Sequence, residues 1–378
     1  QVAAIASTQP TQPLFPFACV WVAMAEGGPK VCWGVLGCAS IAAKTCRGML
    51  EAGQEIVAVG SRSQEKATAW VTEHAPGATA YGSYEEVLND DMVQVVYIPL
   101  PTALKTKWVL KAAAKNKHVL CDKPLAGNFE DAQEMIDACA KAGVQFMDNT
   151  MMMHNDRMQQ IKEVLADCES FGSVKTVVSS FSIPFGNDSA WAQSNIRMNA
   201  SIEPLGCLGD LGWYNVRLSL WAFDYEEPEE VSCHYLEQTD DGVPITSFAI
   251  LRYSGGRSAT FDNSFKSSLR QWAEVVGEKR TVSMDDFVVT KVKDSATFSV
   301  AEGSIGELAE TFPVNIKQQG SIAGCVQHAR LPKRMAELVT GGSVDPLWPR
   351  ISLQTQKVLI ALHESGKSQG AWVKVAGK

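Results

Sequence analysis

The chain lacks clustered metal ligands. Its six histidines are scattered, and its ten cysteines include no C-x-x-C pair. A structural zinc site needs several such ligands at close spacing, so the sequence predicts no metal centre. The cysteines lie singly in apolar stretches, as at Cys32, Cys121, Cys139 and Cys168. This pattern is typical of free thiols in a reducing compartment, and we expect a cytoplasmic protein.

Long hydrophobic runs and targeting signals are also missing. The first 29 residues contain no Lys or Arg, and the apolar stretch 14–25 is interrupted by Pro16. A membrane helix needs about 20 apolar residues, and secretory or transit signals need basic residues. We therefore expect no membrane association. We interpret residues 1–29 as a disordered leader.

The charge balance and the length further limit the classes of protein to which this chain could belong. The formal net charge is −8 and the pI is about 5.4. A nucleic-acid partner would require a basic face, so we expect none, although a local basic pocket for a phosphate stays compatible. The 378 residues exceed one ordinary core and indicate two domains.

Short apolar runs alternate with helical patterns between residues 31 and 148. This alternation predicts an α/β fold with a doubly wound parallel sheet, a Rossmann domain, whose apolar strands are covered on both faces. The expected strands are 31–36, 55–59, 93–98, 118–121 and 144–147, and the expected helices are 41–52, 64–73, 84–88, 104–115 and 130–142.

The pattern changes after residue 150. Turn signals at 240–242 and 254–256 separate successive strands between 229 and about 298, which predicts an open, mostly antiparallel sheet. We assign residues 30–150 to a nucleotide-binding domain and 151–378 to an α/β domain for substrate binding and oligomerisation. Helices are expected at 157–168, 208–223, 322–339 and 351–364, and a further strand at 173–183.

The first strand ends in a glycine turn that opens a helix. On the G-x-G-x-x-G/A template Gly37 supplies the tight turn, and Ala42 permits close helix packing. The alternative is an ordinary tight turn between a strand and a helix. As a nucleotide turn, it would bring a pyrophosphate to the helix N-terminus, against Gly37, Cys38, Ala39, Ser40 and Ile41.

The second strand ends in Ser61-Arg62-Ser63, about 24 residues after Gly37. An NAD enzyme usually places an acid here to hold the ribose 2′-hydroxyl. Arg62 would instead pair with a 2′-phosphate, with the hydroxyl groups of Ser61 and Ser63 as further donors. We expect NADP rather than NAD, with NAD left open. The alternative for Arg62 is a solvated arginine on a loop.

Two later strands end in Pro99-Leu100-Pro101 and Asp122-Lys123-Pro124. Ligands of open parallel sheets bind beyond the carboxyl ends of strands, so both segments should face the cofactor. A lysine held by a following proline can donate to a substrate oxygen. Lys123 is thus a catalytic candidate, with a surface lysine at a strand end as the alternative.

These motifs resemble the glucose–fructose oxidoreductase / inositol dehydrogenase / MocA-type family over about residues 30–366. Lys123 falls on the lysine of the family's Glu-Lys-Pro motif, with Asp122 replacing the glutamate, and 206–214 matches its Gly-rich segment. The sequence is most similar to uncharacterised plant-type oxidoreductases, and also resembles the dihydrodiol and D-xylose dehydrogenase branch. Lys105 departs from the pattern, since many relatives carry histidine there.

The resemblance implies a catalytic set of Lys123, Asp210 and Tyr214. Asp210 and Tyr214 are four residues apart and would share one helix face. Lys123 would stabilise a Tyr214 phenolate that accepts a proton from the substrate hydroxyl. The alternative for Tyr214 is a core aromatic beside Trp213 and Trp221. His154, Arg157 and Arg197 would contact substrate or a cofactor phosphate, and each arginine could equally be a structural ion-pair partner.

We therefore expect an NADP-dependent oxidoreductase acting on a CH–OH or carbonyl group of a sugar, polyol or cyclic diol. A homodimer or homotetramer is expected. One alternative is an enzyme that uses bound NAD(P) transiently for lyase or glycosidase chemistry. Another is an NADP-binding regulator without turnover. The complete Lys123–Asp210–Tyr214 set favours catalysis.

Overall fold

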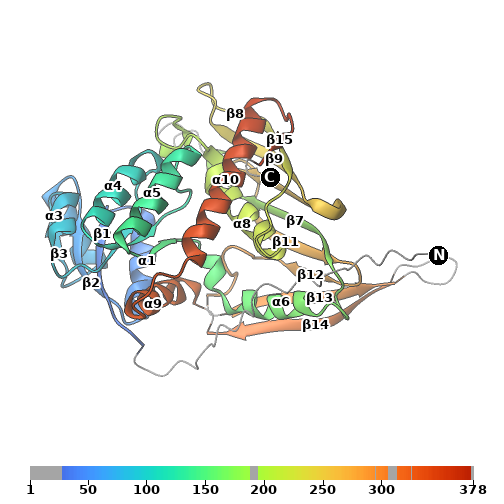
Figure 1. The fold of residues 1–378 in the computed structure, drawn as a ribbon, viewed down its shortest axis with the longest axis horizontal. Helices are drawn as coiled ribbons and strands as arrows, with labels where there is room; N and C mark the ends of the chain where they lie inside the picture. The colour runs from blue at the N-terminus through green and yellow to red at the C-terminus, as the bar shows by residue number, and fades with distance from the viewer. Residues whose placement is uncertain (1–27, 188–194, 294, 305–312, 325, 376–378) are drawn as a thin grey trace, which may run out of the picture.

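Two β-sheets organise the structure, a computed structural model that describes residues 28–187, 195–293, 295–304, 313–324 and 326–375. The interpreted leader lies outside these residues apart from Gly28 and Pro29. In Figure 1 the first sheet and its helices lie on the left, and the second sheet extends to the right. Helix α10 (Leu347–Lys367) runs between them.

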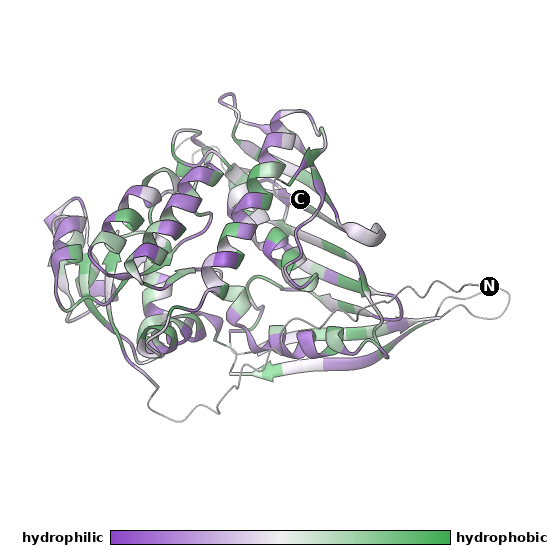
Figure 2. Ribbon diagram, viewed as in Figure 1, coloured by the Kyte–Doolittle hydropathy of each residue, from purple (hydrophilic) through white to green (hydrophobic). Residues whose placement is uncertain are grey.

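The first sheet has six parallel strands in the order β3-β2-β1-β4-β5-β6. This is the strand order of a doubly wound dinucleotide-binding fold, so the predicted Rossmann sheet is confirmed. Apolar residues gather along its strands (Figure 2). The strands are Cys32–Leu36, Glu55–Gly60, Thr79–Tyr81, Val95–Ile98, His118–Cys121 and Phe146–Asp148, and helices α1 to α5 are Ser40–Glu51, Gln64–His74, Tyr84–Asn89, Thr102–Ala114 and Phe129–Ala142.

Local capping explains where several of these helices begin and end. Ser63, Ser83 and Asn128 each accept a hydrogen bond from the amide three residues ahead, which starts α2, α3 and α5. Gly143 ends α5 with φ 67°, a left-handed conformation that favours glycine.

The second sheet has nine strands in the order β14-β13-β12-β11-β7-β10-β9-β8-β15. Neighbouring strands are antiparallel except for the parallel pair β7–β10, so the mostly antiparallel sheet is confirmed. Helix α8 (Trp213–Ala222) packs on β7 and α10 on β8. The strands β7 to β15 are Val174–Ser182, Glu230–Gln238, Pro244–Arg252, Ser258–Ser264, Arg270–Gly277, Thr281–Met284, Ser295–Gly303, Val314–Ala323 and Val373–Lys374.

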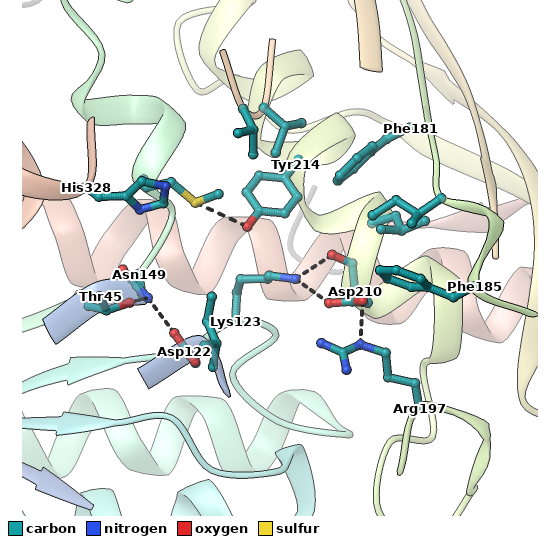
Figure 3. A pocket seen from close by; sticks show the side chains of 16 residues that line it. Thr45, Asp122, Lys123, Asn149, Phe181, Phe185, Arg197, Asp210, Tyr214 and His328 are labelled. Carbon is teal, nitrogen blue, oxygen red and sulfur yellow. Dashed lines mark hydrogen bonds and ion pairs between the residues drawn. The ribbon is translucent and has the colours of Figure 1, made fainter. Parts of the chain in front are cut away.

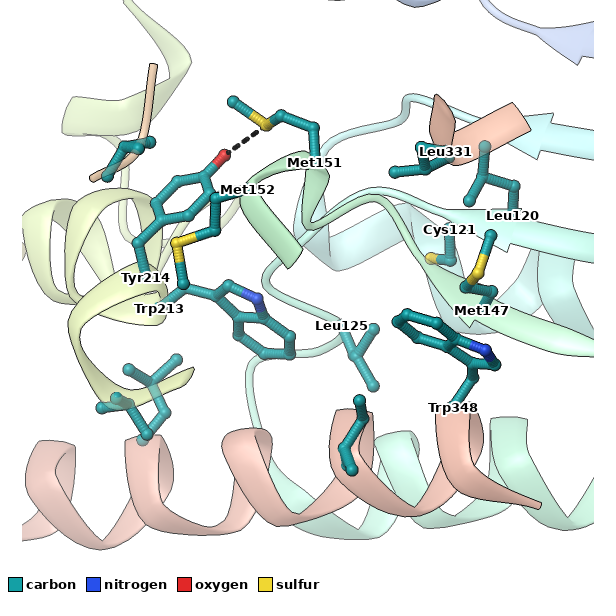
Figure 4. Packing of buried hydrophobic residues seen from close by; sticks show 14 of the residues in the cluster. Leu120, Cys121, Leu125, Met147, Met151, Met152, Trp213, Tyr214, Leu331 and Trp348 are labelled. Atoms are coloured by element: carbon teal, nitrogen blue, oxygen red, sulfur yellow. Dashed lines mark hydrogen bonds between the residues drawn. The ribbon is translucent and has the colours of Figure 1, made fainter. Parts of the chain in front are cut away.

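A buried ion pair joins the two halves of the molecule. Asp148, at the end of β6, lies 2.8 Å from Arg217 of α8, and both side chains are fully buried. Breaking such a pair leaves an uncompensated charge and costs about 3–5 kcal/mol. Trp213 and Trp348 pack nearby with Leu125 and Met147 (Figure 4). The end of the first sheet is therefore fixed against α8 and α10.

Three strands and one helix start differ from the sequence-based expectation, and one of these strands, β15, has only two residues and lies beyond the last expected element. Strand β3 was missed because its three residues are partly exposed and form no apolar run. Strand β14 was missed because most of its residues are exposed. The helix expected from Ile322 begins only at Gln327, as α9 (Gln327–Thr340), because Ile322 still belongs to β14. Within the described residues, no helix is long and apolar enough to cross a bilayer.

Candidate active site

The glycine turn after β1 has the properties of an anion-binding turn. Gly37 has φ 124°, and its amide donates to the Gly60 carbonyl at 2.9 Å. Helix α1 begins at Ser40 with no side-chain cap and no acidic residue in its first turn. The Ala42 amide donates to the Ala39 carbonyl at 3.0 Å, and the amides before it, at Ser40 and Ile41, precede the regular helix bonds and suit a pyrophosphate. The residues present fit a dinucleotide, and Cys38, Ala39 and Ile41 lie on this turn.

The turn after β2 places only part of the expected phosphate site at the surface. Arg62 is exposed, whereas Ser61 is buried. The Ser63 hydroxyl accepts a hydrogen bond from the Lys66 amide and donates one to the Glu65 carboxylate at 2.6 Å. Ser63 therefore caps α2, and its hydroxyl proton is already used. Burial raises the pKa of the Cys38 thiol, and Lys66 is near enough to oppose that shift. Lys66 is thus a second cation near the turn, which the sequence analysis missed.

The ends of β4 and β5 lie beside the glycine turn, as expected for an open parallel sheet. Pro99 and Leu100 are buried and Pro101 is half-buried. A Cβ on Gly37 would make a tight contact of 3.2 Å with the Leu100 side chain, and its φ of 124° is a conformation that residues with a side chain rarely adopt. The Pro99–Pro101 segment therefore shapes the wall of the turn.

Asp122 is fixed in a hydrogen-bonded network that joins β4, β5 and α1. Asn149 donates to the Asp122 carboxylate at 2.6 Å, and the Tyr97 hydroxyl donates to the same carboxylate at 3.2 Å. Tyr97 also lies 3.1 Å from the Thr45 hydroxyl. Burial raises the pKa of Asp122, and Lys105 opposes this most strongly. The shorter aspartate is thus accommodated within a closed network at the strand ends.

Lys105, the departure from the family's histidine, is buried at 1% exposure. Its ammonium donates to the Pro124 carbonyl at 2.7 Å and lies 3.4 Å from the Thr102 hydroxyl. Lys105 therefore holds the backbone carbonyl of Pro124, the residue that follows Lys123.

The three residues expected to be catalytic meet in one pocket (Figure 3). Lys123 donates to the Asp210 carboxylate at 2.6 Å and to the Asp210 backbone carbonyl at 2.5 Å. Arg197 binds the other carboxylate oxygen at 2.7 Å. Despite burial, Arg197 and Lys123 hold the pKa of Asp210 well below its ordinary value. Asp210 is therefore a carboxylate that orients two cations.

Tyr214 is in the pocket, but its environment differs from the expected one. The Lys123 nitrogen lies 4.9 Å from the ring centre, and the hydroxyl points to the Met151 sulfur at 3.4 Å. Burial raises the pKa of Tyr214 well above its ordinary value, and Asp210 adds to the shift. The expected Tyr214 phenolate stabilised by Lys123 is therefore not supported by this geometry.

An apolar wall faces the charged residues. It comes from β7 and the loop after it, from the turn before α8 and from the segment before β13. The described residues that line the pocket are Ile41, Thr45, Asp122, Lys123, Asn149, Met151, Phe181, Ile183, Phe185, Arg197, Asp210, Leu211, Tyr214, Val288, Val289 and His328.

Two expected substrate residues do not occur among the described residues that line this pocket. Arg157 is fully buried and pairs with Asp286, so its structural alternative is the one that the structure supports. His154 is 4% exposed and stacks on Trp348 with ring centres 4.7 Å apart. Burial lowers the pKa of His154 to about 3. The ring is therefore packed against α10, away from the described lining residues, and its substrate role stays a prediction.

His328 is a pocket residue that the sequence analysis missed. It lies on α9, 180 residues after β6 ends at Asp148, and no local motif marks it. Among the described residues, no group of three or more His, Cys, Asp or Glu side chains is placed to hold a metal ion.

Comparisons with known proteins agree with this architecture. Residues 31–150 match the model of the oxidoreductase family with an NAD-binding Rossmann fold, and residues 158–283 match the GFO/IDH/MocA C-terminal domain. An uncharacterised oxidoreductase of Rhizobium meliloti is 31% identical over 91% of this chain and 98% of its own length. An NADP⁺-dependent D-xylose 1-dehydrogenase of Haloferax volcanii is 33% identical over 64% of this chain and 72% of its own.

A solved structure supports the fold. KijD10, a 3-ketoreductase from Actinomadura kijaniata in complex with NADP, has a TM-score of 0.76 at 22% identity over 89% of this chain and 98% of its own. The strand order, the glycine turn and both family models lead to the same conclusion. The chain belongs to the Gfo/Idh/MocA family of NAD(P)-dependent oxidoreductases.

Proposed function

We propose that this protein is an NADP-dependent oxidoreductase of a neutral sugar, polyol or cyclic diol, oxidising a CH–OH group or reducing the matching carbonyl. The observation that carries the proposal is the Lys123 amine, held by Asp210 in a pocket at the carboxyl end of the nucleotide-binding sheet. Relatives named as D-xylose and dihydrobenzenediol dehydrogenases act on substrates of this class.

Lys123 is the residue that moves the proton in this proposal. Its ammonium donates to the substrate oxygen during reduction, and the amine accepts the hydroxyl proton during oxidation. Asp210 holds the amine, and Arg197 presents the rest of its guanidinium to a second substrate oxygen. Tyr214 forms the wall behind the amine. The bound nicotinamide supplies or accepts the hydride.

The charges of the pocket favour an uncharged substrate. The two cations that line the pocket, Lys123 and Arg197, are matched by two carboxylates, Asp122 and Asp210. Phe181, Ile183 and Phe185 present an apolar surface that suits the C–H face of a ring. A cyclic substrate with two neighbouring oxygens can bind the charged side chains through its oxygens and the apolar surface through its ring.

Arg62 supports NADP as the preferred cofactor, because a guanidinium pairs with a 2′-phosphate and no acid stands in its place. Lys66 adds positive charge near the same turn.

The test is reduced-nicotinamide absorbance with purified protein, NADP⁺ or NAD⁺, and a panel of aldoses, polyols and trans-diols. Turnover with NADP⁺ on a neutral panel member supports the proposal. Dinucleotide binding without turnover on any member of the panel would favour the alternative function, an NADP-binding regulator. Lys123→Ala serves as the matched inactive control.

We also propose the domain assignment, the oligomer and the location. Residues 30–150 carry the dinucleotide and residues 151–378 the substrate pocket and the subunit contacts. The open face of the nine-stranded sheet would form a homodimer or homotetramer, which light scattering tests. The eight described cysteines are all free, which suits a reducing cytoplasm.

A further inference from the structure

His328 lies in the pocket, yet the proposed proton transfer does not use it. It is the second residue of α9 and lines the pocket with Ile41 and Thr45 of α1. In Figure 3, His328, Thr45 and Asn149 lie on one side of Lys123, and Asp210 and Arg197 lie on the other. The pocket therefore has two ends, and His328 belongs to the end beside α1, whose first turn suits the pyrophosphate.

The Nε2 atom of His328 is buried and has no hydrogen-bond partner in the part of the chain that the structure describes. The neighbouring polar groups are already engaged. Thr45 lies 3.1 Å from the Tyr97 hydroxyl, and the Asn149 amide donates to Asp122 at 2.6 Å. A buried polar group left unpaired costs about 1–3 kcal/mol. An occupant of this end of the pocket would supply the missing partner.

The ring is uncharged near neutral pH. Burial lowers the pKa of His328 to about 4, and the Lys44 ammonium on α1 lowers it further. A neutral imidazole presents one N–H donor and one acceptor nitrogen. Such a group matches an uncharged amide and offers no charge for a phosphate or carboxylate.

Close packing of α9 on α1 fixes the position of this residue. A Cβ on Gly48 would lie 2.2 Å from the His328 carbonyl oxygen. The two helices can approach this closely because residue 48 has no side chain. His328 is therefore held by backbone contact rather than placed by a loop.

We propose that His328 binds the carboxamide of the nicotinamide ring through Nε2, which makes it a cofactor-binding residue supplied by the second half of the chain. The proposal rests on dinucleotide binding and does not depend on which substrate the enzyme takes. The contact secures the nicotinamide end, whereas the turn at Gly37 and the Arg62 side chain hold the phosphates.

The test compares two ligands by calorimetry, NADP⁺ and adenosine 2′,5′-bisphosphate, which lacks the nicotinamide. In His328→Ala the Kd of NADP⁺ should rise about 5- to 20-fold, the effect of one lost hydrogen bond to a buried group. The Kd of the bisphosphate should stay within twofold of wild type. An unchanged NADP⁺ affinity, or equal weakening of both ligands, would overturn the proposal.

Two further variants separate this contact from a general loss of structure. His363→Ala removes another histidine whose pKa is lowered to about 4, on α10 and bonded to Tyr235 at 2.6 Å, and NADP⁺ binding should not change. His328→Gln keeps a hydrogen-bonding group, and should recover part of the NADP⁺ affinity lost in His328→Ala. Failure to recover it would count against the contact. Tight NADP⁺ binding without turnover would defeat the proposed function and leave this contact standing.

Discussion

The Lys123 ammonium donates to the Asp210 backbone carbonyl at 2.5 Å and to the Asp210 carboxylate at 2.6 Å, although the two residues are 87 positions apart in the sequence. Lys123 follows the fifth strand of the first sheet, and Asp210 precedes α8 of the second half. The direction of the amine is therefore set by how the two halves pack, because each half supplies one end of the bond.

Replacing Lys123 by alanine should lower kcat by about 10²–10⁴-fold, because the proton donor to the substrate oxygen is lost. Stopped-flow or steady-state absorbance measures the effect, and NADP⁺ affinity by calorimetry should change far less. Lys123→Arg is the control for charge alone, since an arginine cannot release its proton. Full activity in Lys123→Ala would refute the assignment.

Arg62→Ala should raise the KM for NADP⁺ about 10- to 100-fold and leave the KM for NAD⁺ unchanged, because only the 2′-phosphate contact is removed. Lys66→Ala should give a smaller loss in the same direction. Equal effects on both cofactors would show that Arg62 does not contact the 2′-phosphate.

Asp210→Asn should destabilise the protein near neutral pH, and the difference from wild type should shrink in acid. The pKa of Asp210 lies well below its unfolded value of 3.8. The ion pairs therefore contribute fully above that value, and their contribution is lost as pH falls toward the folded pKa. Melting temperatures from pH 7 to 3 measure the gap. A gap that stays constant below pH 3.8 would contradict this linkage.

Gly48→Ala should destabilise the protein by about 1–3 kcal/mol, although alanine favours helices, because its Cβ would meet the His328 carbonyl oxygen at 2.2 Å. Urea unfolding measures the loss. Gly303→Ala is the matched control, since the space around that position is open and little change is expected. A stabilised Gly48→Ala variant would show that α9 does not pack so closely on α1.

Lys105→Met should cost about 1–3 kcal/mol in stability, because the Pro124 carbonyl loses its partner at 2.7 Å. It should also lower kcat more than it raises the KM for substrate, since the backbone beside Lys123 shifts. Lys105→His, which keeps a hydrogen-bond donor at this position, should recover part of kcat. A loss of stability with unaltered kcat would make Lys105 purely structural.

The sequence by itself determined the parallel sheet, the glycine turn at Gly37 and the place of Lys123 at a strand end. Apolar runs, glycine and proline determine the conformation of the residues next to them, so these features can be predicted from short stretches of sequence. The short strand β3 and the exposed strand β14 escaped because neither carries a hydrophobic pattern.

Only the tertiary structure decided which polar groups share a pocket. Arg197 reaches Asp210, whereas Arg157 pairs with Asp286 in the interior, although both arginines looked alike as candidates. His328 enters the site because Gly48 lets α9 lie against α1. Such contacts join residues that are distant in sequence, and they depend on how helices and sheets pack, which local patterns do not encode.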